Sequence, residues 1–318
     1  MDSLGGKVAL VFPGQGSQFV GMGRALYEAS AAARRVFDQA DEVLGFSISR
    51  LCFHGPAEDL EDTINAQPAI LTVSIAALEA MKERLANTGQ KVEPVVVAGH
   101  SLGEFTALVA AGVIDFPAGL QLVRERGRLM KEAGEERPGG MAAVIGLDTE
   151  TLAAVCVDAA DGAVITVAND NCPGQTVISG EIAALMRAME MAKAKGAKRV
   201  ARLGISIASH SPLMARASAG LSEILSKLPL HAPQVPVVAN VSGLTMRSVE
   251  EVRQELAHHV ERPVNWTRSV AEMANSGVTT FIEVGPGQVL SGLIRRIQRD
   301  AITLNLTDLG LPADRREA

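Results

Sequence analysis

One stretch of the chain decides its fold: Val-Val-Val-Ala-Gly-His-Ser-Leu-Gly-Glu, residues 95–104. Its first four residues are apolar and predict a buried strand. Gly99 and Gly103 then flank Ser101 in a Gly-x-Ser-x-Gly pattern, and helical periodicity follows. Glycines on both sides of a serine allow a sharp turn from strand to helix, which is the context of a nucleophile elbow. The stretch therefore predicts an α/β protein with a reactive serine at the end of one strand.

Ser101 has two interpretations in this context. As a nucleophile it would present Oγ at the helix N-terminus, where partial positive charge favours a developing anion. As a structural residue it would only cap the helix. The strand before the turn and the helix after it favour the nucleophile.

Strands and helices alternate on both sides of the elbow. Residues 7–12 predict a buried strand, and the alanine and leucine content of 68–85 predicts a buried helix with proline at its start. Helical patterns also cover 106–111 and 117–130. This alternation predicts a largely parallel sheet covered by helices on both faces.

A different order of elements occupies residues 139–203. The patterns read strand, helix, strand, strand, helix, strand, which is the β-α-β-β-α-β order of the ferredoxin-like split unit. The expected strands are 141–145, 164–168, 176–179 and 199–203, and the expected helices are 149–159 and 181–195. We therefore expect a small subdomain inserted into the larger domain.

The alternating pattern returns after the insertion. The expected strands there are 237–241, 280–284 and 302–306, and the expected helices are 249–259 and 289–299. The 318 residues thus divide into a catalytic domain, 1–133 and 204–318, and a ferredoxin-like subdomain, 134–203. The tail from Leu311 carries four charges in its last five residues, and we expect it to be solvated.

Composition excludes several classes of function. A formal net charge of −6 and an aromatic content of 3% argue against a nucleic-acid binder. The three cysteines, Cys52, Cys156 and Cys172, are widely spaced and predict neither a metal site nor disulfides. No leader is evident in residues 1–9, and we find no run of roughly 18 to 20 apolar residues, so we expect a cytoplasmic protein without a membrane segment.

A serine nucleophile needs a base, because its hydroxyl is almost wholly protonated at neutral pH. His210 is the leading candidate among the six histidines, since it directly follows the return from the inserted subdomain, where clefts form. The other histidines have simpler explanations as a turn-orienting residue, helix-end residues or surface residues: His100, His258 and His259, and His54 and His231, respectively.

The glycine-rich turn at residues 14–18, Gly-Gln-Gly-Ser-Gln, is not a dinucleotide fingerprint. Phe19 occupies the position where close helix packing requires Gly or Ala. The turn can instead supply a backbone N–H, which together with the Leu102 N–H would make a two-donor oxyanion hole. A purely structural turn is the alternative.

Arg124, Arg126 and Arg128 alternate along a predicted helix, so they lie on different faces and at most one or two can point into a cleft. A cleft arginine would bind a free carboxylate through two charge-assisted hydrogen bonds, worth about 1.5–3 kcal/mol. For any one of them, a solvated helix surface is the simpler interpretation.

Seven motifs together resemble the malonyl-CoA:acyl-carrier-protein transacylases, the free-standing acyltransferases of fatty-acid or polyketide synthesis. The resemblance runs from about Ala9 to Asp300. The motifs are Phe-Pro-Gly-Gln-Gly-Ser-Gln (12–18), Gly-His-Ser-Leu-Gly-Glu (99–104), Arg-Gly (126–127), the segment 169–175, Ser-His (209–210), Pro-Val-Asn-Trp (263–266) and Glu-Val-Gly-Pro-Gly (283–287).

This resemblance implies an α/β-hydrolase-like large domain and assigns roles to the site residues. They are Ser101 as nucleophile, His210 as base, Arg126 as carboxylate clamp, the N–H groups of Gln15 and Leu102 as oxyanion hole, and Met130, Asn171 and Ser209 as substrate-binding residues of the acyl pocket. It also implies a monomer without cofactor or metal that takes malonyl from malonyl-CoA and passes it to an acyl carrier protein in two stages.

Two features separate this chain from the family pattern or leave the substrate open. The family's glutamine that orients the catalytic histidine falls on His259, and we expect a backbone carbonyl to do the orienting there; a side-chain role would instead couple His259 to His210. The Ile207-Ala208-Ser209 run resembles polyketide acyltransferases that use methyl-branched extenders, although free-standing fatty-acid enzymes also carry the serine. We expect malonyl, with methylmalonyl as the alternative.

Two rival functions belong to other classes. One is a serine hydrolase, either a generic esterase or an enzyme that edits acyl groups on an acyl carrier protein. The other is a carrier-protein docking module with a decayed site. Arg126 argues against the hydrolase, which has no use for a carboxylate clamp, and the intact Ser101, His210 and Arg126 argue against decay.

Overall fold

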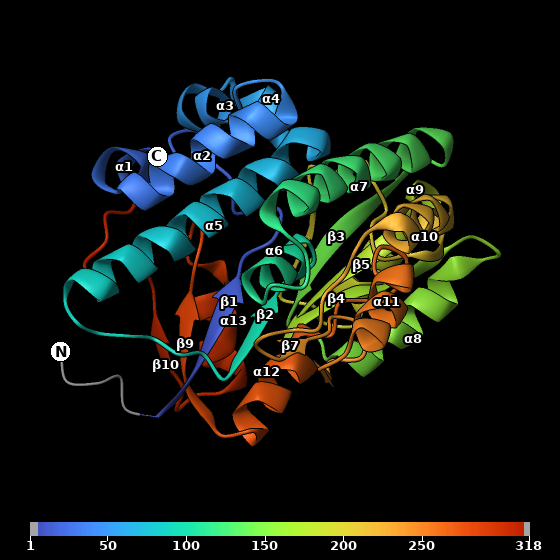
Figure 1. The fold of residues 1–318 in the computed structure, drawn as a ribbon. Helices are drawn as coiled ribbons and strands as arrows, with labels where there is room; N and C mark the ends of the chain where they lie inside the picture. The colour runs from blue at the N-terminus through green and yellow to red at the C-terminus, as the bar shows by residue number, and fades with distance from the viewer. Residues whose placement is uncertain (1–5, 315–318) are drawn as a thin grey trace.

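The computed structural model describes residues 6–314 (Figure 1). Residues 1–5 and 315–318, which include part of the N-terminal segment and of the charged tail considered above, lie outside the described residues. The main sheet has six strands, in the order β10-β9-β1-β2-β7-β8. Their bounds are β1 Lys7–Phe12, β2 Val96–Gly99, β7 Val237–Val238, β8 Thr245–Met246, β9 Val278–Glu283 and β10 Ile302–Leu304. All neighbouring pairs are parallel except β7 and β8, so the predicted, largely parallel sheet is confirmed.

Helices cover both faces of this sheet, because side chains along each strand alternate between the faces. Val8 and Leu10 of β1 pack into a core with α2, α5, α6 and α7, whereas Ala9 and Val11 pack into a second core with α12 and α13 (Figure 1). The helices of this domain are α1 Arg24–Ala29, α2 Ala31–Leu44, α3 Ile48–His54, α4 Ala57–Glu61, α5 Thr63–Asn87, α6 Leu102–Ala110, α7 Phe116–Glu136, α10 Ala215–Lys227, α11 Val249–His258, α12 Trp266–Asn275 and α13 Val289–Ile297, with a short 3₁₀ turn at Pro212–Met214.

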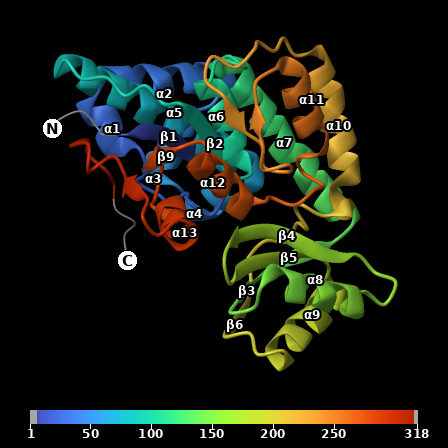
Figure 2. The same ribbon diagram turned by 90° about the horizontal axis from the view of Figure 1, so that it is seen from below.

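The inserted unit forms a separate lobe beside the main sheet (Figure 2). Its elements are β3 Gly139–Ile145, α8 Thr149–Ala160, β4 Ile165–Cys172, β5 Gln175–Glu181, α9 Ile182–Ala194 and β6 Arg199–Arg202. The four strands pair in the order β4-β5-β3-β6, all antiparallel, and α8 and α9 share a core with one face of the sheet. The predicted β-α-β-β-α-β order is therefore confirmed.

Two backbone hydrogen bonds join the lobe to the main domain. Asp170 N–H donates to the Val264 carbonyl at 2.9 Å, and Val264 N–H donates to the Ala168 carbonyl at 2.9 Å. β4 of the lobe thus extends toward the segment before α12. The face of the lobe's sheet that is not covered by α8 and α9 lies over the carboxyl ends of the strands of the main sheet.

Several elements differ from their predicted bounds: the helix predicted to end at residue 130 runs to Glu136 as α7, and the strand predicted over 164–168 runs to Cys172 as β4. Two further differences have a clear physical cause. The helix predicted to begin at Pro68 begins at Thr63 instead, because the Asp62 carboxylate accepts the Ile64 N–H at 3.0 Å and caps an earlier first turn. The strand predicted over 237–241 ends at Val238, because the chain turns there and Asn240 uses its side chain to bind the elbow.

α5 is also long and apolar enough to cross a membrane, by length and composition alone, and it is the one such helix among residues 6–314. The helix is not an unbroken apolar run, since Thr72, Ser74 and Glu79 interrupt it, so the expectation of no run of 18 to 20 apolar residues is not contradicted. Of its most apolar window, 83% is buried inside the protein. α5 is therefore the central core helix, packed between α2 and α7.

Gly127→Ala should destabilise the protein by about 1–3 kcal/mol, because a Cβ at this position of α7 cannot be accommodated against α5. The new atom would lie 2.6 Å from the Thr63 carbonyl oxygen and 2.9 Å from Ile64 Cα. Urea unfolding measures the loss. Gly292→Ala on α13 is the matched control: nothing lies within 4 Å of its added Cβ, so it should gain about 0.5–1 kcal/mol. Equal stabilities for the two variants would contradict this packing.

Candidate active site

The elbow predicted from the sequence forms at the carboxyl end of β2. Ser101 has φ 50° and ψ −108°, a strained conformation for a residue with a side chain. Both glycines are needed because backbones approach closely: a Cβ on Gly99 would lie 1.9 Å from the Gly103 carbonyl, and one on Gly103 would lie 2.1 Å from the Phe12 carbonyl oxygen. The turn therefore presents Oγ of Ser101 at the start of α6.

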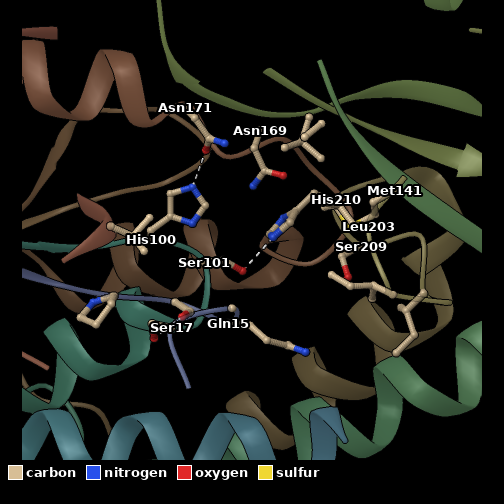
Figure 3. Close-up of a pocket in the computed structure, with 18 of the residues that line it drawn as sticks. Gln15, Ser17, His100, Ser101, Met141, Asn169, Asn171, Leu203, Ser209 and His210 are labelled. Atoms are coloured by element: carbon tan, nitrogen blue, oxygen red, sulfur yellow. Dashed lines mark hydrogen bonds between the residues drawn. The ribbon is translucent and has the colours of Figure 1, made fainter. Parts of the chain in front are cut away.

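The structure brings His210 to this serine across 109 residues of sequence. Its Nε2 lies 2.8 Å from Ser101 Oγ (Figure 3). Its Nδ1 faces two backbone carbonyl oxygens, that of His259 at 3.1 Å and that of Arg262 at 3.0 Å. Only a protonated Nδ1 can satisfy two acceptors, so Nε2 carries the lone pair and can accept the serine proton.

Burial keeps this imidazole neutral. Burial, and after it the nearby charge of Arg126, lower the pKa of His210 from 6.5 to about 3, although the Arg262 carbonyl acts in the opposite direction. At neutral pH the side chain is therefore in the form that acts as a base.

Arg126 is the third group in the cluster. Arg126 lies in the middle of α7, and its side chain is only 2% exposed, although arginine is rarely buried. Nη2 donates to Ser101 Oγ at 3.1 Å, Nη1 donates to Gln67 Oε1 at 2.6 Å, and the guanidinium carbon lies 5.3 Å from the centre of the Phe105 ring. Burial lowers the pKa of Arg126 to about 9, so the group stays charged at pH 7.

The other two arginines of this helix lie elsewhere, as their spacing predicts. Arg124 donates to the Leu44 carbonyl and stacks on Phe46. Arg128 pairs with Glu125 and Glu132 on the surface. Of the three, only Arg126 reaches the cluster.

A chain of side-chain hydrogen bonds fixes the arginine from behind. Gln67 Nε2 donates to Thr63 Oγ1 at 2.9 Å, and Thr63 Oγ1 donates to Gln15 Oε1 at 3.1 Å. Gln67 also contacts the sulfur of Met130 at 3.6 Å. The glycine-rich turn after β1 and the arginine on α7 are therefore joined through α5.

The glycine-rich turn itself packs directly against the elbow. A Cβ on Gly14 would lie 2.2 Å from the His100 carbonyl oxygen, so only glycine allows the approach. Among residues 6–314, neither the Gln15 N–H nor the Leu102 N–H donates a hydrogen bond to another residue. The two donors predicted from the sequence are thus free, on the two segments that meet at Ser101.

The cluster lies in a cavity of about 460 Å³. One wall comes from the open face of the lobe, where Met141 and Leu203 lie beside the cluster (Figure 3). Val177 belongs to the same wall. The remaining predicted pocket residues, Met130, Asn171 and Ser209, also line the cavity.

His259 is buried and His100 is half-buried, and the two have different roles. His100 Nε2 lies 2.8 Å from Asn171 Oδ1, which ties the elbow to β4 of the lobe. His259 was expected either to stabilise a helix end or to orient the base. Its side chain is 1% exposed and burial lowers its pKa, so it is not the helix-end cation that was one expectation, and its backbone carbonyl is one of the two acceptors of His210.

Three residues of the cluster escaped the sequence analysis: Gln67, Asn240 and Glu104. Gln67 and Asn240 were detectable in principle as amides within apolar segments that read as buried, since a buried amide requires partners. Glu104 was visible in the elbow motif, but nothing local indicated that it faces inward.

Among residues 6–314 no group of three or more His, Cys, Asp or Glu side chains is placed to hold a metal ion.

Modification of Ser101 should continue well below pH 6.5, because the lowered pKa of His210 keeps it neutral there. The measurement is the rate of labelling by a fluorophosphonate from about pH 5 to about pH 8. In Arg126→Ala the acidic fall of the labelling rate should move to higher pH, since a positive charge that disfavours the imidazolium form of His210 is lost. In Arg126→Lys it should stay at the wild-type pH. If the labelling rate of the wild-type protein fell with a midpoint at pH 6.5, a neutral, buried base would be refuted.

His259→Gln should leave acyl loading of Ser101 within severalfold of wild type, because a backbone carbonyl at this position accepts the His210 hydrogen bond. Single-turnover acylation measures the effect. A loss of about a hundredfold, which is the scale of general-base catalysis, would show that the imidazole itself is required.

Comparison with known proteins agrees with this geometry. The family model described as "Acyl transferase domain" matches residues 9–305. The chain is 45% identical over 303 residues to malonyl CoA-acyl carrier protein transacylase of Bacillus subtilis, covering 95% of this chain and 94% of that protein.

Solved structures agree as well. A crystal structure of an acyl carrier protein S-malonyltransferase from Vibrio cholerae superposes with a TM-score of 0.89 at 43% identity, over 94% of this chain and 96% of that one. A malonyl-transacylase in complex with a type II PKS acyl-carrier protein gives a TM-score of 0.89 at 41% identity, over 94% and 95% of the two chains. This chain therefore belongs to the acyl transferase domain family, among the malonyl CoA-acyl carrier protein transacylases.

Proposed function

We propose that this protein transfers a malonyl group from malonyl-CoA to the phosphopantetheine thiol of an acyl carrier protein, through an ester on Ser101. The observation that carries the proposal is the buried guanidinium of Arg126, which lies 3.1 Å from Ser101 Oγ. A buried cation beside a nucleophile suits an acyl group that ends in a carboxylate. The names of the relatives agree with this substrate.

The first half-reaction forms the acyl-enzyme. His210 Nε2 takes the proton of Ser101 as Oγ attacks the thioester carbonyl, and the negative charge that develops on the carbonyl oxygen is stabilised by the N–H groups of Gln15 and Leu102. The tetrahedral intermediate then breaks its C–S bond. Coenzyme A leaves as a thiol after taking the proton from His210.

The second half-reaction reverses these steps with a different thiol. His210 takes the proton of the phosphopantetheine thiol, the sulfur attacks the acyl-serine carbonyl, and the same two N–H groups stabilise the oxyanion. The C–O bond to Ser101 breaks, and His210 returns the proton to Oγ. No group outside the chain and its two substrates is needed, so we propose a reaction without metal or cofactor.

Arg126 acts in both halves as the clamp for the malonyl carboxylate. Gln67 holds Nη1, and Nη2 can turn from Ser101 Oγ to the substrate. Such a charge-assisted contact contributes about 1.5–3 kcal/mol. Met130, Asn171 and Ser209 shape the pocket around the acyl group. A serine hydrolase that edits simple acyl chains would gain nothing from this buried charge and would have to desolvate it.

Two wider properties follow the same proposal. The free, buried thiols of Cys52, Cys156 and Cys172 suit a reducing cytoplasm. The chain divides into a catalytic domain, 1–133 and 204–318, and a subdomain, 134–203, because β3 to β6 enclose a core of their own with α8 and α9.

Malonyl-CoA should add one malonyl group to Ser101, and acetyl-CoA should add little, when each is mixed with the protein and the intact mass is measured. Arg126→Ala should lose about 10–100-fold in malonyl loading and gain in acetyl loading, because the carboxylate contact is lost. Ser101→Ala is the control for the site of attachment. Equal loading of the two acyl groups on the wild type would reject the malonyl proposal.

A further inference from the structure

One buried carboxyl near the site has no part in the mechanism above. Glu104 lies on the first turn of α6, three residues after Ser101, and its side chain is fully buried. Its Oε2 accepts the Asn240 backbone N–H at 3.1 Å and lies 3.2 Å from Nε2 of His259. A buried carboxyl is costly unless it is well bonded, so its contacts indicate what it does.

On one side the contacts lead to the nucleophile. Asn240 Oδ1 accepts the Ser101 N–H at 2.6 Å, and Asn240 Nδ2 donates to the Gly99 carbonyl at 2.7 Å. The amide therefore clamps the strained elbow on both sides of His100. Glu104 holds the backbone of Asn240 and so fixes where that amide stands.

On the other side the contacts lead to the base. The backbone carbonyl of His259 accepts the Nδ1–H of His210, and the two imidazole rings lie 5.8 Å apart, edge to face. The His259 ring also packs against Phe105, with 5.1 Å between ring centres. A shift of the His259 ring would move the carbonyl that orients His210.

The geometry indicates a neutral carboxyl. Oε1 of Glu104 has no hydrogen-bond partner among residues 6–314, which would be costly for a carboxylate oxygen. Burial, together with the nearby Glu255, raises the pKa of Glu104 well above its ordinary value, and burial lowers the pKa of His259. A neutral acid keeps its carbonyl oxygen at Oε2, which accepts the Asn240 N–H and contacts Nε2 of His259.

A neutral Glu104 also has a consequence for the substrate. Arg126 is then the one charged group among these buried side chains at pH 7. Its charge is not cancelled by the carboxyl behind the elbow and is available to a substrate carboxylate.

We propose that Glu104 is a positioning residue that holds Ser101 and His210 in register, through Asn240 on one side and His259 on the other, and that it acts as a hydrogen-bonding group of fixed shape rather than as a negative charge. The inference rests on the proposed function only in that Ser101 and His210 react as a pair. It does not depend on which acyl group is carried.

The experiment compares Glu104→Gln with Glu104→Leu. Glutamine keeps the shape and the acceptor of a neutral acid, so fluorophosphonate labelling of Ser101 should stay within about threefold of wild type. Leucine removes the acceptor, and labelling should slow by about 10²-fold, the cost of a small misplacement of reacting groups. The reagent concentration for half-maximal rate should not change, because Glu104 does not contact the reagent site.

Glu255→Gln is the matched control. Glu255 is also a buried carboxyl, and its Oε1 accepts the Val241 N–H at 2.7 Å, one residue beyond Asn240, without contacting His259. Its labelling rate should remain that of wild type even where its thermal stability falls. If Glu104→Leu does not fold, Asn240→Ala tests the same link and should also slow labelling.

A proton NMR signal gives a readout that a merely structural role would not move. The Nδ1–H of His210 should keep its position in Glu104→Gln and in Glu255→Gln, and should shift or broaden in Glu104→Leu. Three outcomes would each overturn the proposal. They are labelling of Glu104→Leu at the wild-type rate, labelling of Glu104→Gln as slow as that of Glu104→Leu, and labelling of Glu255→Gln as slow as that of Glu104→Leu. Wild-type labelling without any malonyl loading would instead overturn the proposed function and leave this inference standing.

Discussion

The contact on which the rest of the structure depends is the 2.8 Å approach of Ser101 Oγ to His210 Nε2. Both residues have positive φ, 50° and 58°, and each such conformation costs of order 1–3 kcal/mol. The surroundings hold them there. Backbone carbonyls press against the glycines of the elbow, and the His210 N–H donates to the Val260 carbonyl at 2.8 Å while Nδ1 is held by two more carbonyls.

Desolvation then decides which groups around this contact are charged. It lowers the pKa of His210, raises that of Glu104 and leaves Arg126 charged, so the buried cluster carries one positive charge. Both neutral groups suit their positions. His210 must be unprotonated to act as a base, and a neutral Glu104 does not cancel the charge of Arg126. The same burial that costs stability therefore prepares the cavity for an anionic acyl group.

The architecture explains why the cavity lies where it does. β1 and β2 are adjacent parallel strands, so the turn after Phe12 and the elbow after Gly99 meet at the carboxyl ends of the strands. The lobe of β3 to β6 uses one face of its sheet for its own helices and turns the other, with Met141 and Val177, toward those ends. The site is thus closed by two units that are separate in the sequence pattern.

The sequence by itself determined what depends on local burial and backbone conformation. The strand Lys7–Phe12 has its predicted bounds, and the ferredoxin-like order follows from alternating patterns, because apolar periodicity reports which face of an element is buried. The elbow was also readable, since glycines at 99 and 103 permit a turn that few other residues allow.

Only the tertiary structure decided which distant side chains share the cavity. His210 and Arg126 reach Ser101 from 109 and 25 residues away. The sequence favoured His210 only by its place after the insertion, and the clamp role of Arg126 rested on family resemblance, because local pattern carries no information on proximity across a sheet. The same reason hid Gln67, Asn240 and the inward-facing Glu104. It also explains the short β7, where a long-range bond from Asn240 outweighs local propensity. The early start of α5 at Thr63 has a local cause instead, the cap at Asp62.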